Sequence, residues 1–134
     1  MADWTEITLV EAPSVAYAGE SIRIAVKVKN IHTSIVQVAP SGSYNGYGLY
    51  LGSSFYLDPG EEIIIYSDYF SMPDKDIIAV ITALSLSGGQ FGRSNILSIG
   101  ISLTVPRIIS EVFSAGLVIV ALGMIMPAIM KNLK

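Results

Sequence analysis

The chain has 134 residues, of which 51% are hydrophobic, and it carries a net charge of −3 and no cysteine. This length suits one small domain with an appendage, and the missing cysteines exclude disulfides, thiol chemistry and cysteine-ligated zinc. Residues 1–106 hold ten acidic against five basic side chains, which argues against a nucleic-acid partner because phosphate binding needs clustered Lys or Arg.

The first thirty residues are predicted to form short strands. Residues 6–10 and 14–18 are expected to be strands on either side of Pro13, with Gly19 in a turn. Residues 21–30 alternate between apolar and mostly basic side chains, which is typical of a half-buried antiparallel strand. One face of this strand would carry Ile22, Ile24, Val26 and Val28, and the other Arg23, Lys27 and Lys29.

The middle of the chain contains two strong turn signals. Residues 34–39 are expected to be a strand, and Asn45 with Gly46 predicts a two-residue hairpin because both residues tolerate positive φ. Residues 48–57 would be the return strand. The sequence Asp-Pro-Gly-Glu at 58–61 predicts a tight turn.

The next segments are predicted to complete a sheet. Residues 63–67 and 77–85 are expected to be strands, and the second is almost continuously apolar, which is typical of a central strand covered on both faces. Glycines at 88, 89 and 92 predict a loop. The last strand, 95–104, would alternate Ile99, Ile101 and Leu103 with Ser98, Gly100 and Ser102.

The total is about seven or eight short strands with turn signals about every 8–12 residues, which predicts an all-β fold. We therefore expect a single antiparallel β-sandwich over residues 1–105. We expect residues 106–134 to be the appendage, a C-terminal helix that follows the last strand almost directly.

Residues 112–130 contain no charged side chain and are almost wholly apolar. As a helix this stretch would span about 28 Å, close to the hydrocarbon thickness of a bilayer. We therefore expect a single-pass C-terminal transmembrane anchor, placing the protein at a cell envelope or in a virion membrane. The anchor would include Val112, Phe113, Gly116, Leu117, Val120, Gly123, Ile125, Met126 and Ile129.

The C-terminal segment leaves alternatives open. Gly116 and Gly123 would share one helix face and let another helix approach closely. An apolar helix buried in an oligomer core would have the same composition, whereas an interfacial helix is disfavoured because it needs a polar face. The lysines at 131 and 134 favour a cytoplasmic C-terminus, while the lack of a signal-peptide pattern favours the opposite orientation.

Three segments carry a family resemblance. Ala18-Gly-Glu-Ser21 leads into Ile24–Asn30, Leu57-Asp-Pro-Gly-Glu61 precedes a middle strand, and Phe70–Asp76 precedes the strand at Ile77. Over residues 5–104 the chain resembles the immunoglobulin-like sandwiches of bacterial, archaeal and phage surface proteins, including the CARDB-type adhesion-related domain. The disulfide and central Trp of antibody domains are absent. The resemblance implies adhesion, spacing or structural display without catalysis.

Two sets of polar side chains are candidates for chemistry. His32 is the only histidine, and no Gly-x-Ser-x-Gly motif accompanies it, so we interpret it as a solvated loop residue rather than a catalytic or metal-binding one. Asp68, Asp74 and Asp76 cluster around one loop. Ca²⁺ takes several oxygen ligands, so this loop is either a calcium site or an acidic solvent-facing loop.

Aromatic residues provide the best candidate for a binding surface. Tyr44, Tyr47 and Tyr50 lie among glycines, as in adaptable recognition loops, although tyrosines of a hairpin also pack across strands. Phe91 and Arg93 of the last loop are the second candidate. We expect any recognition site to use one of these two groups.

The sequence therefore predicts a non-enzymatic, membrane-anchored structural or adhesion protein that displays a β-sandwich. Its expected partners are the lipid bilayer and copies of itself or other envelope or virion proteins, and no cofactor, nucleic acid or small-molecule substrate is expected. One alternative is a soluble phage or virus assembly subunit whose apolar helix is buried in an oligomer. The other is a calcium-binding module that uses the Asp68–Asp76 loop.

Overall fold

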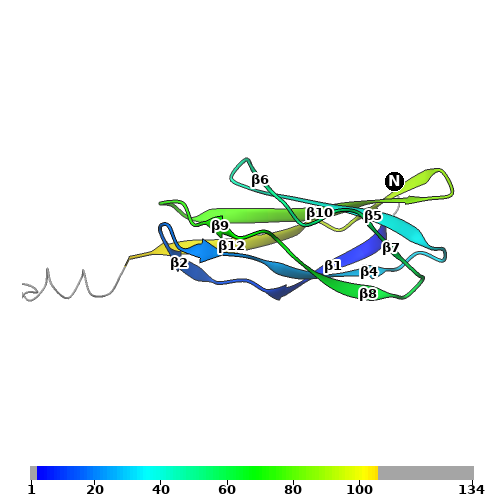
Figure 1. Ribbon diagram of the computed structural model, residues 1–134, viewed down its shortest axis with the longest axis horizontal. Coiled ribbons are helices and arrows are strands. Elements are labelled where there is room, and N and C mark those ends of the chain that lie inside the picture. Colours follow the sequence, from blue (N-terminus) through cyan, green and yellow to red (C-terminus); the bar gives the residue numbers. More distant parts are fainter. Residues whose placement is uncertain (1–2, 106–134) are drawn as a thin grey trace, which may run out of the picture. The chain divides into compact units, whose positions relative to one another are not determined.

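The computed structural model describes residues 3–105, which form twelve strands and no helix (Figure 1). All but the last two of these residues belong to one compact unit, Met1–Leu103. The strands are β1 (Asp3–Glu11), β2 (Val15–Tyr17), β3 (Ser21–Ile22), β4 (Ala25–Asn30), β5 (Val36–Tyr44), β6 (Tyr47–Leu49), β7 (Phe55–Leu57), β8 (Glu62–Tyr66), β9 (Phe70–Ser71), β10 (Ile77–Ser87), β11 (Gln90–Ser94) and β12 (Leu97–Thr104).

Two layers of strands enclose the core. In the first layer β4 lies between β1 and β8, and in the second β10 lies between β5 and β12. β2 extends the second layer beside β12, β6 and β7 pair with β5, and the short β3 and β9 pair with each other. β11 links the layers because it pairs with β10 on one side and, in parallel, with the start of β1 on the other. The predicted all-β fold is confirmed over these residues.

Alternating side chains build the core from both layers. Ile24, Val26 and Val28 are fully buried, as the pattern of residues 21–30 predicted. From the other layer, Ile77 and Ile81 of β10 point into the same apolar cluster. Both layers therefore bury one face in the way that period-two alternation requires.

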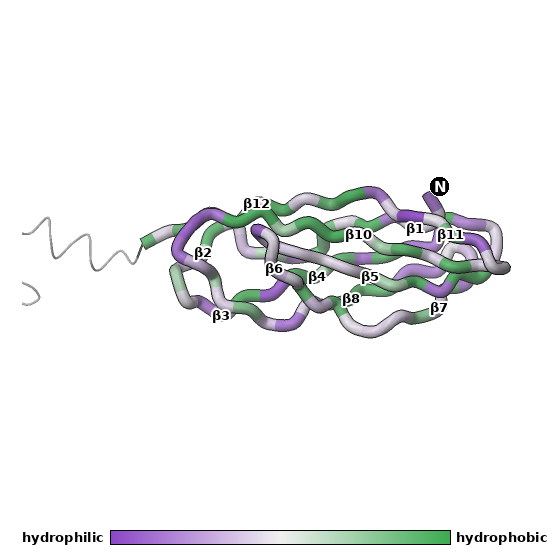
Figure 2. Tube along the Cα trace, turned by 90° about the horizontal axis from the view of Figure 1, so that it is seen from above, coloured by the Kyte–Doolittle hydropathy of each residue, from purple (hydrophilic) through white to green (hydrophobic). Residues whose placement is uncertain are grey.

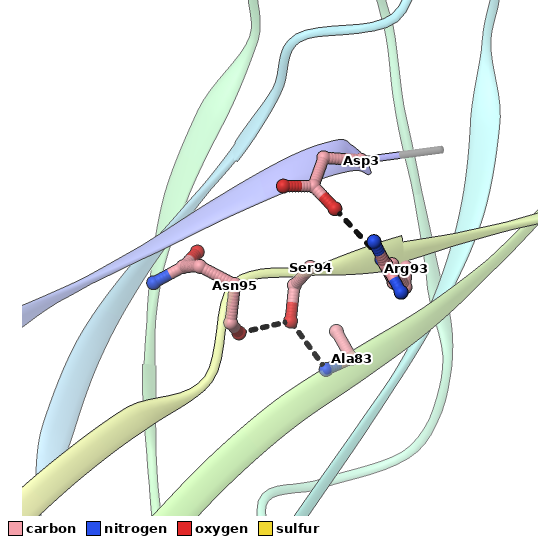
Figure 3. A network of polar contacts seen from close by, with 5 residues as sticks. All are labelled: Asp3, Ala83, Arg93, Ser94 and Asn95. Carbon is pink, nitrogen blue, oxygen red and sulfur yellow. Dashed lines mark hydrogen bonds and ion pairs between the residues drawn. The ribbon is translucent and has the colours of Figure 1, made fainter. Parts of the chain in front are cut away.

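The chain bends sharply between strands β11 and β12, at Asn95. The hydroxyl of Ser94 accepts a hydrogen bond from the backbone N–H of Ala83 (2.8 Å) and donates one to the carbonyl oxygen of Asn95 (2.7 Å; Figure 3). The Asn95 side-chain amide accepts from the backbone N–H of Ile7 (2.7 Å) and donates to its carbonyl oxygen (2.9 Å). At this bend the side chain of Asn95, instead of the backbone of a paired strand, provides hydrogen-bond partners for the N–H and carbonyl groups of Ile7 in β1.

Gly92 makes room for the only tryptophan. Trp4 of β1 is buried, and its indole stacks on the imidazole of His32 with ring centroids 4.1 Å apart. A Cβ atom at Gly92 would lie 2.6 Å from Cε3 of this indole and closer still to two other ring atoms. Gly92 was predicted to lie in a loop, but it lies in β11. The glycine is explained by the close approach of Trp4 rather than by a turn.

Two predicted strands are interrupted. Residues 21–30 form β3 and β4 with a break between them, where the backbone N–H of Ile24 donates to the hydroxyl of Ser67 (2.9 Å). Residues 48–57 contain β6 and β7 separated by an irregular segment. The predicted hairpin turn is confirmed, because Asn45 and Gly46 have φ of 48° and 87°.

Candidate interaction surface

The predicted tyrosine loop is partly a structural element. Tyr44, at the end of β5, stacks on Phe70 with ring centroids 4.5 Å apart and packs against the core. Tyr47 and Tyr50 are exposed. Of the three tyrosines in this group, therefore, only Tyr47 and Tyr50 are free to contact another molecule.

Phe91 and Arg93 lie toward the opposite end of β10. Phe91 is opposite Leu86 and Arg93 is opposite Leu84, whereas Tyr44 is opposite Ala79. Nε of Arg93 lies 3.0 Å from Oδ1 of Asp3, so this arginine is already paired (Figure 3). The two candidate groups do not form one site, and the second lies on strand β11 rather than in the predicted loop.

Strand β10 is rich in hydrophobic residues (Figure 2). Its outward side chains form an exposed apolar stripe on the outer face of the second layer. The stripe consists of the outward side chains Ile78, Val80, Thr82, Leu84 and Leu86. Ile78 and Leu84 are 59% and 46% exposed. The sequence predicted a strand covered on both faces, but the described residues cover only the inner face. This prediction was wrong for residues 3–105.

Few charges surround the stripe. The strand register places Gln37, Ala39, Ser41 and Ser43 on one side of it and Phe91, Arg93, Ser98 and Gly100 on the other. The only charged member of this set is Arg93, which pairs with Asp3. The outward side chains of β5, β10, β11 and β12 form this surface. We call it the uncharged face, because its one charged side chain is neutralised by an ion pair.

Two shallow hollows mark the uncharged face. They have volumes of about 220 and 480 Å³, and both are lined by Ala39 and Leu84. The first also contacts Phe91 and the second Ile96, whose side chain is 71% exposed. The surface therefore combines bulky apolar side chains with recesses beside them.

The outer face of the first layer is different. Lys29 of β4 is flanked by Glu6 of β1 and Glu62 of β8, and Nζ of Lys27 lies 3.7 Å from Oε1 of Glu62. Ile64 is opposite Lys27 on this face. Mixed charges of this kind are typical of a sheet face in water, so the two outer faces of the sandwich differ in chemistry.

Two of the remaining candidate side chains, His32 and Asp76, have structural contacts. His32 lies in a loop, as predicted, but its imidazole is partly buried against Trp4 instead of fully open to solvent. Oδ1 of Asp76 accepts a hydrogen bond from the backbone N–H of Leu103 (2.8 Å). Within residues 3–105 no group of three or more His, Cys, Asp or Glu side chains could hold a metal ion. Calcium binding by the Asp68–Asp76 loop stays a prediction.

The predicted anchor lies outside the described residues, and so do its packing residues Gly116 and Gly123. Among residues 3–105, no helix is long and apolar enough to span a membrane.

The sequence matches no model of a known protein family and no curated protein. Among solved structures, it is similar to native alpha-2-macroglobulin from Escherichia coli, with a TM-score of 0.62 and 17% identity over 78% of this chain and 17% of that one. A FixG-related protein from Vibrio parahaemolyticus has a TM-score of 0.57 and 11% identity over 78% of this chain and 100% of that one.

A third similar structure is the CARDB domain of a Pyrococcus furiosus protein in complex with di-metal ions. It has a TM-score of 0.52 and 20% identity over 76% of this chain and 92% of that one. Likeness at these identities shows the fold alone. Residues 3–105 thus have the immunoglobulin-like β-sandwich fold of CARDB domains, as the resemblance in the sequence implied.

Proposed function

We propose that this chain is a non-enzymatic structural or adhesion module that packs against copies of itself through the uncharged face, while residues 112–130 anchor it in a membrane. The observation that carries the proposal is the exposed stripe on β10. Its pattern is that of a strand buried on both faces, and only one face is buried within residues 3–105. A second copy of the chain supplies the missing cover.

Charge permits a second copy as the occupant of this face and disfavours it elsewhere on the surface. Residues 1–106 have a net charge of −5, so two copies that meet at random surfaces repel each other. On the uncharged face the only charge, that of Arg93, is neutralised by Asp3. Two copies therefore meet there without burying an unpaired charge.

Shape also favours a self-complementary contact. In a two-fold arrangement, the same patch of each copy faces the other. Phe91 and Ile96 of one copy would then fill the hollows beside Leu84 of the other. Burying the exposed half of each aliphatic side chain contributes about 1 kcal/mol, and a membrane anchor would raise the effective concentration of the copies.

The test compares Leu84→Lys with Ile64→Lys in the full chain. These side chains are 46% and 49% exposed, on the uncharged face and on the charged face respectively. In mild detergent, light scattering coupled to size exclusion should give an oligomer for the wild type and Ile64→Lys, and a monomer for Leu84→Lys, because a lysine there is buried unpaired. A monomeric wild type, or equal dissociation by both variants, contradicts the proposal.

The anchor is tested separately by alkaline extraction of membranes that contain the full chain. Retention in the membrane supports insertion of residues 112–130. Release of an intact oligomer supports the soluble assembly subunit instead.

A further inference from the structure

A second surface feature lies on the first layer, away from the uncharged face. It is an open pocket of about 360 Å³ at the end of β1, next to the break between β3 and β4. Its walls combine an apolar segment with aromatic and charged side chains. They are Glu11, Ala12, Pro13, Ser21, Ile22, Arg23, Ala25, Tyr66 and Tyr69.

Arg23 is held in this pocket by two aromatic rings. Its Cζ atom lies 4.4 Å from the ring centroid of Tyr66 and 4.8 Å from that of Tyr69. Distances of this size are typical of cation–π contacts. No ion pair or hydrogen bond among the described residues uses the Arg23 side chain, so its N–H donors are available to a ligand.

The free donors determine the ligand chemistry. A guanidinium group binds a carboxylate through two parallel N–H···O hydrogen bonds. Glu11 lines the same pocket, so a ligand that also presents hydrogen-bond donors would pair with both side chains, which a carboxylate anion alone cannot do. Ala12 and Pro13 offer apolar surface for a ring beside the guanidinium group. A carboxylate, several hydroxyl groups and an apolar ring face occur together in an acidic sugar.

We propose that this pocket binds a uronic acid residue of a glycan, with its carboxylate on Arg23 and its hydroxyl groups toward Glu11. The site is separate from the uncharged face, so a test of glycan binding and a test of self-association can fail independently of each other. Binding of a glycan would give the adhesion module a ligand on the surface of a cell.

The test is an NMR titration of the full ¹⁵N-labelled chain in detergent micelles with D-glucuronate, with D-glucose and acetate as comparison probes. The Nε–Hε signal of Arg23, assigned by its loss in Arg23→Lys, should shift with glucuronate and remain still with glucose. Absence of a shift with glucuronate overturns the site. An equal affinity for acetate overturns the assignment to a sugar ring.

Variants separate binding from structure. Arg23→Lys should weaken glucuronate binding about tenfold or more because lysine cannot form the bidentate pair. Tyr69→Ala should also weaken it, whereas Tyr69→Phe keeps the ring and should bind normally. Arg93→Lys is the matched control, since that arginine pairs with Asp3 elsewhere on the domain. Equal binding by Arg23→Lys and Arg93→Lys contradicts the proposal.

Discussion

Gly92→Ala should lower the free energy of unfolding by about 3 kcal/mol or more, a large part of the stability of a small domain. The added methyl group would overlap the Trp4 indole. Either the ring leaves its position in the core or β11 moves away from β1. Both responses remove the packing of a large buried aromatic side chain, which costs about 3–5 kcal/mol when it is lost completely.

The measurement is urea unfolding of the full chain, followed by the fluorescence of Trp4, its only tryptophan. Gly100→Ala is the matched control. Gly100 also lies in a strand, and a Cβ atom there would have no neighbour within 4 Å. This control should be neutral or slightly stabilising, because glycine costs conformational entropy in a strand. Equal effects of the two substitutions would refute the close approach of Trp4.

Asn30→Ala should destabilise the domain by about 3 kcal/mol through lost hydrogen bonds. Asn30 is 0% exposed. Its Nδ2 donates to the carbonyl oxygens of Ser34 (2.9 Å) and Leu57 (3.0 Å), and its Oδ1 accepts from the backbone N–H of His32 (2.7 Å). The substitution leaves three backbone groups without these partners, and the carbonyl group of Leu57 is buried away from water.

The same unfolding experiment checks this prediction. Thr33→Ala provides the control, because Thr33 lies in the same turn with an exposed side chain. Its effect should stay within about 0.5 kcal/mol. A loss of stability for Asn30→Ala that is no larger than this would show that the turn does not depend on the buried amide.

Local patterns in the sequence predicted much of the fold. The alternation in residues 21–30 and 95–104 identified the buried faces of β4 and β12, and Asn45 with Gly46 identified the hairpin turn. These features depend on period-two alternation and on positive φ, which neighbouring residues determine.

Contacts between distant residues could not be predicted in this way. Gly92 suggested a loop because the reason for a glycine there, the packing of Trp4, comes from a residue almost ninety positions away in the sequence. The bend at Asn95 likewise depends on the backbone of Ile7. Arg23 was predicted only to face outward, since its two tyrosine neighbours come from the end of β8 and the segment after it.

The candidate surface overlaps the sequence prediction at two positions. Phe91 and Arg93 both belong to the uncharged face, and their role in binding stays a prediction, whereas the apolar stripe of β10 was interpreted as covered. A strand has the same apolar sequence whether its second face is covered by its own chain or by another molecule. Only the exposure of Ile78 and Leu84 separates these cases.

The most direct test of the uncharged face as a self-association surface is chemical cross-linking of single-cysteine variants, because the chain has no cysteine of its own. Leu84→Cys and Ile64→Cys would each be treated with a short bismaleimide in the full chain within membranes. We expect covalent dimers for Leu84→Cys and few or none for Ile64→Cys. Equal dimer yields from the two positions, or dimers through Ile64→Cys alone, would contradict the account.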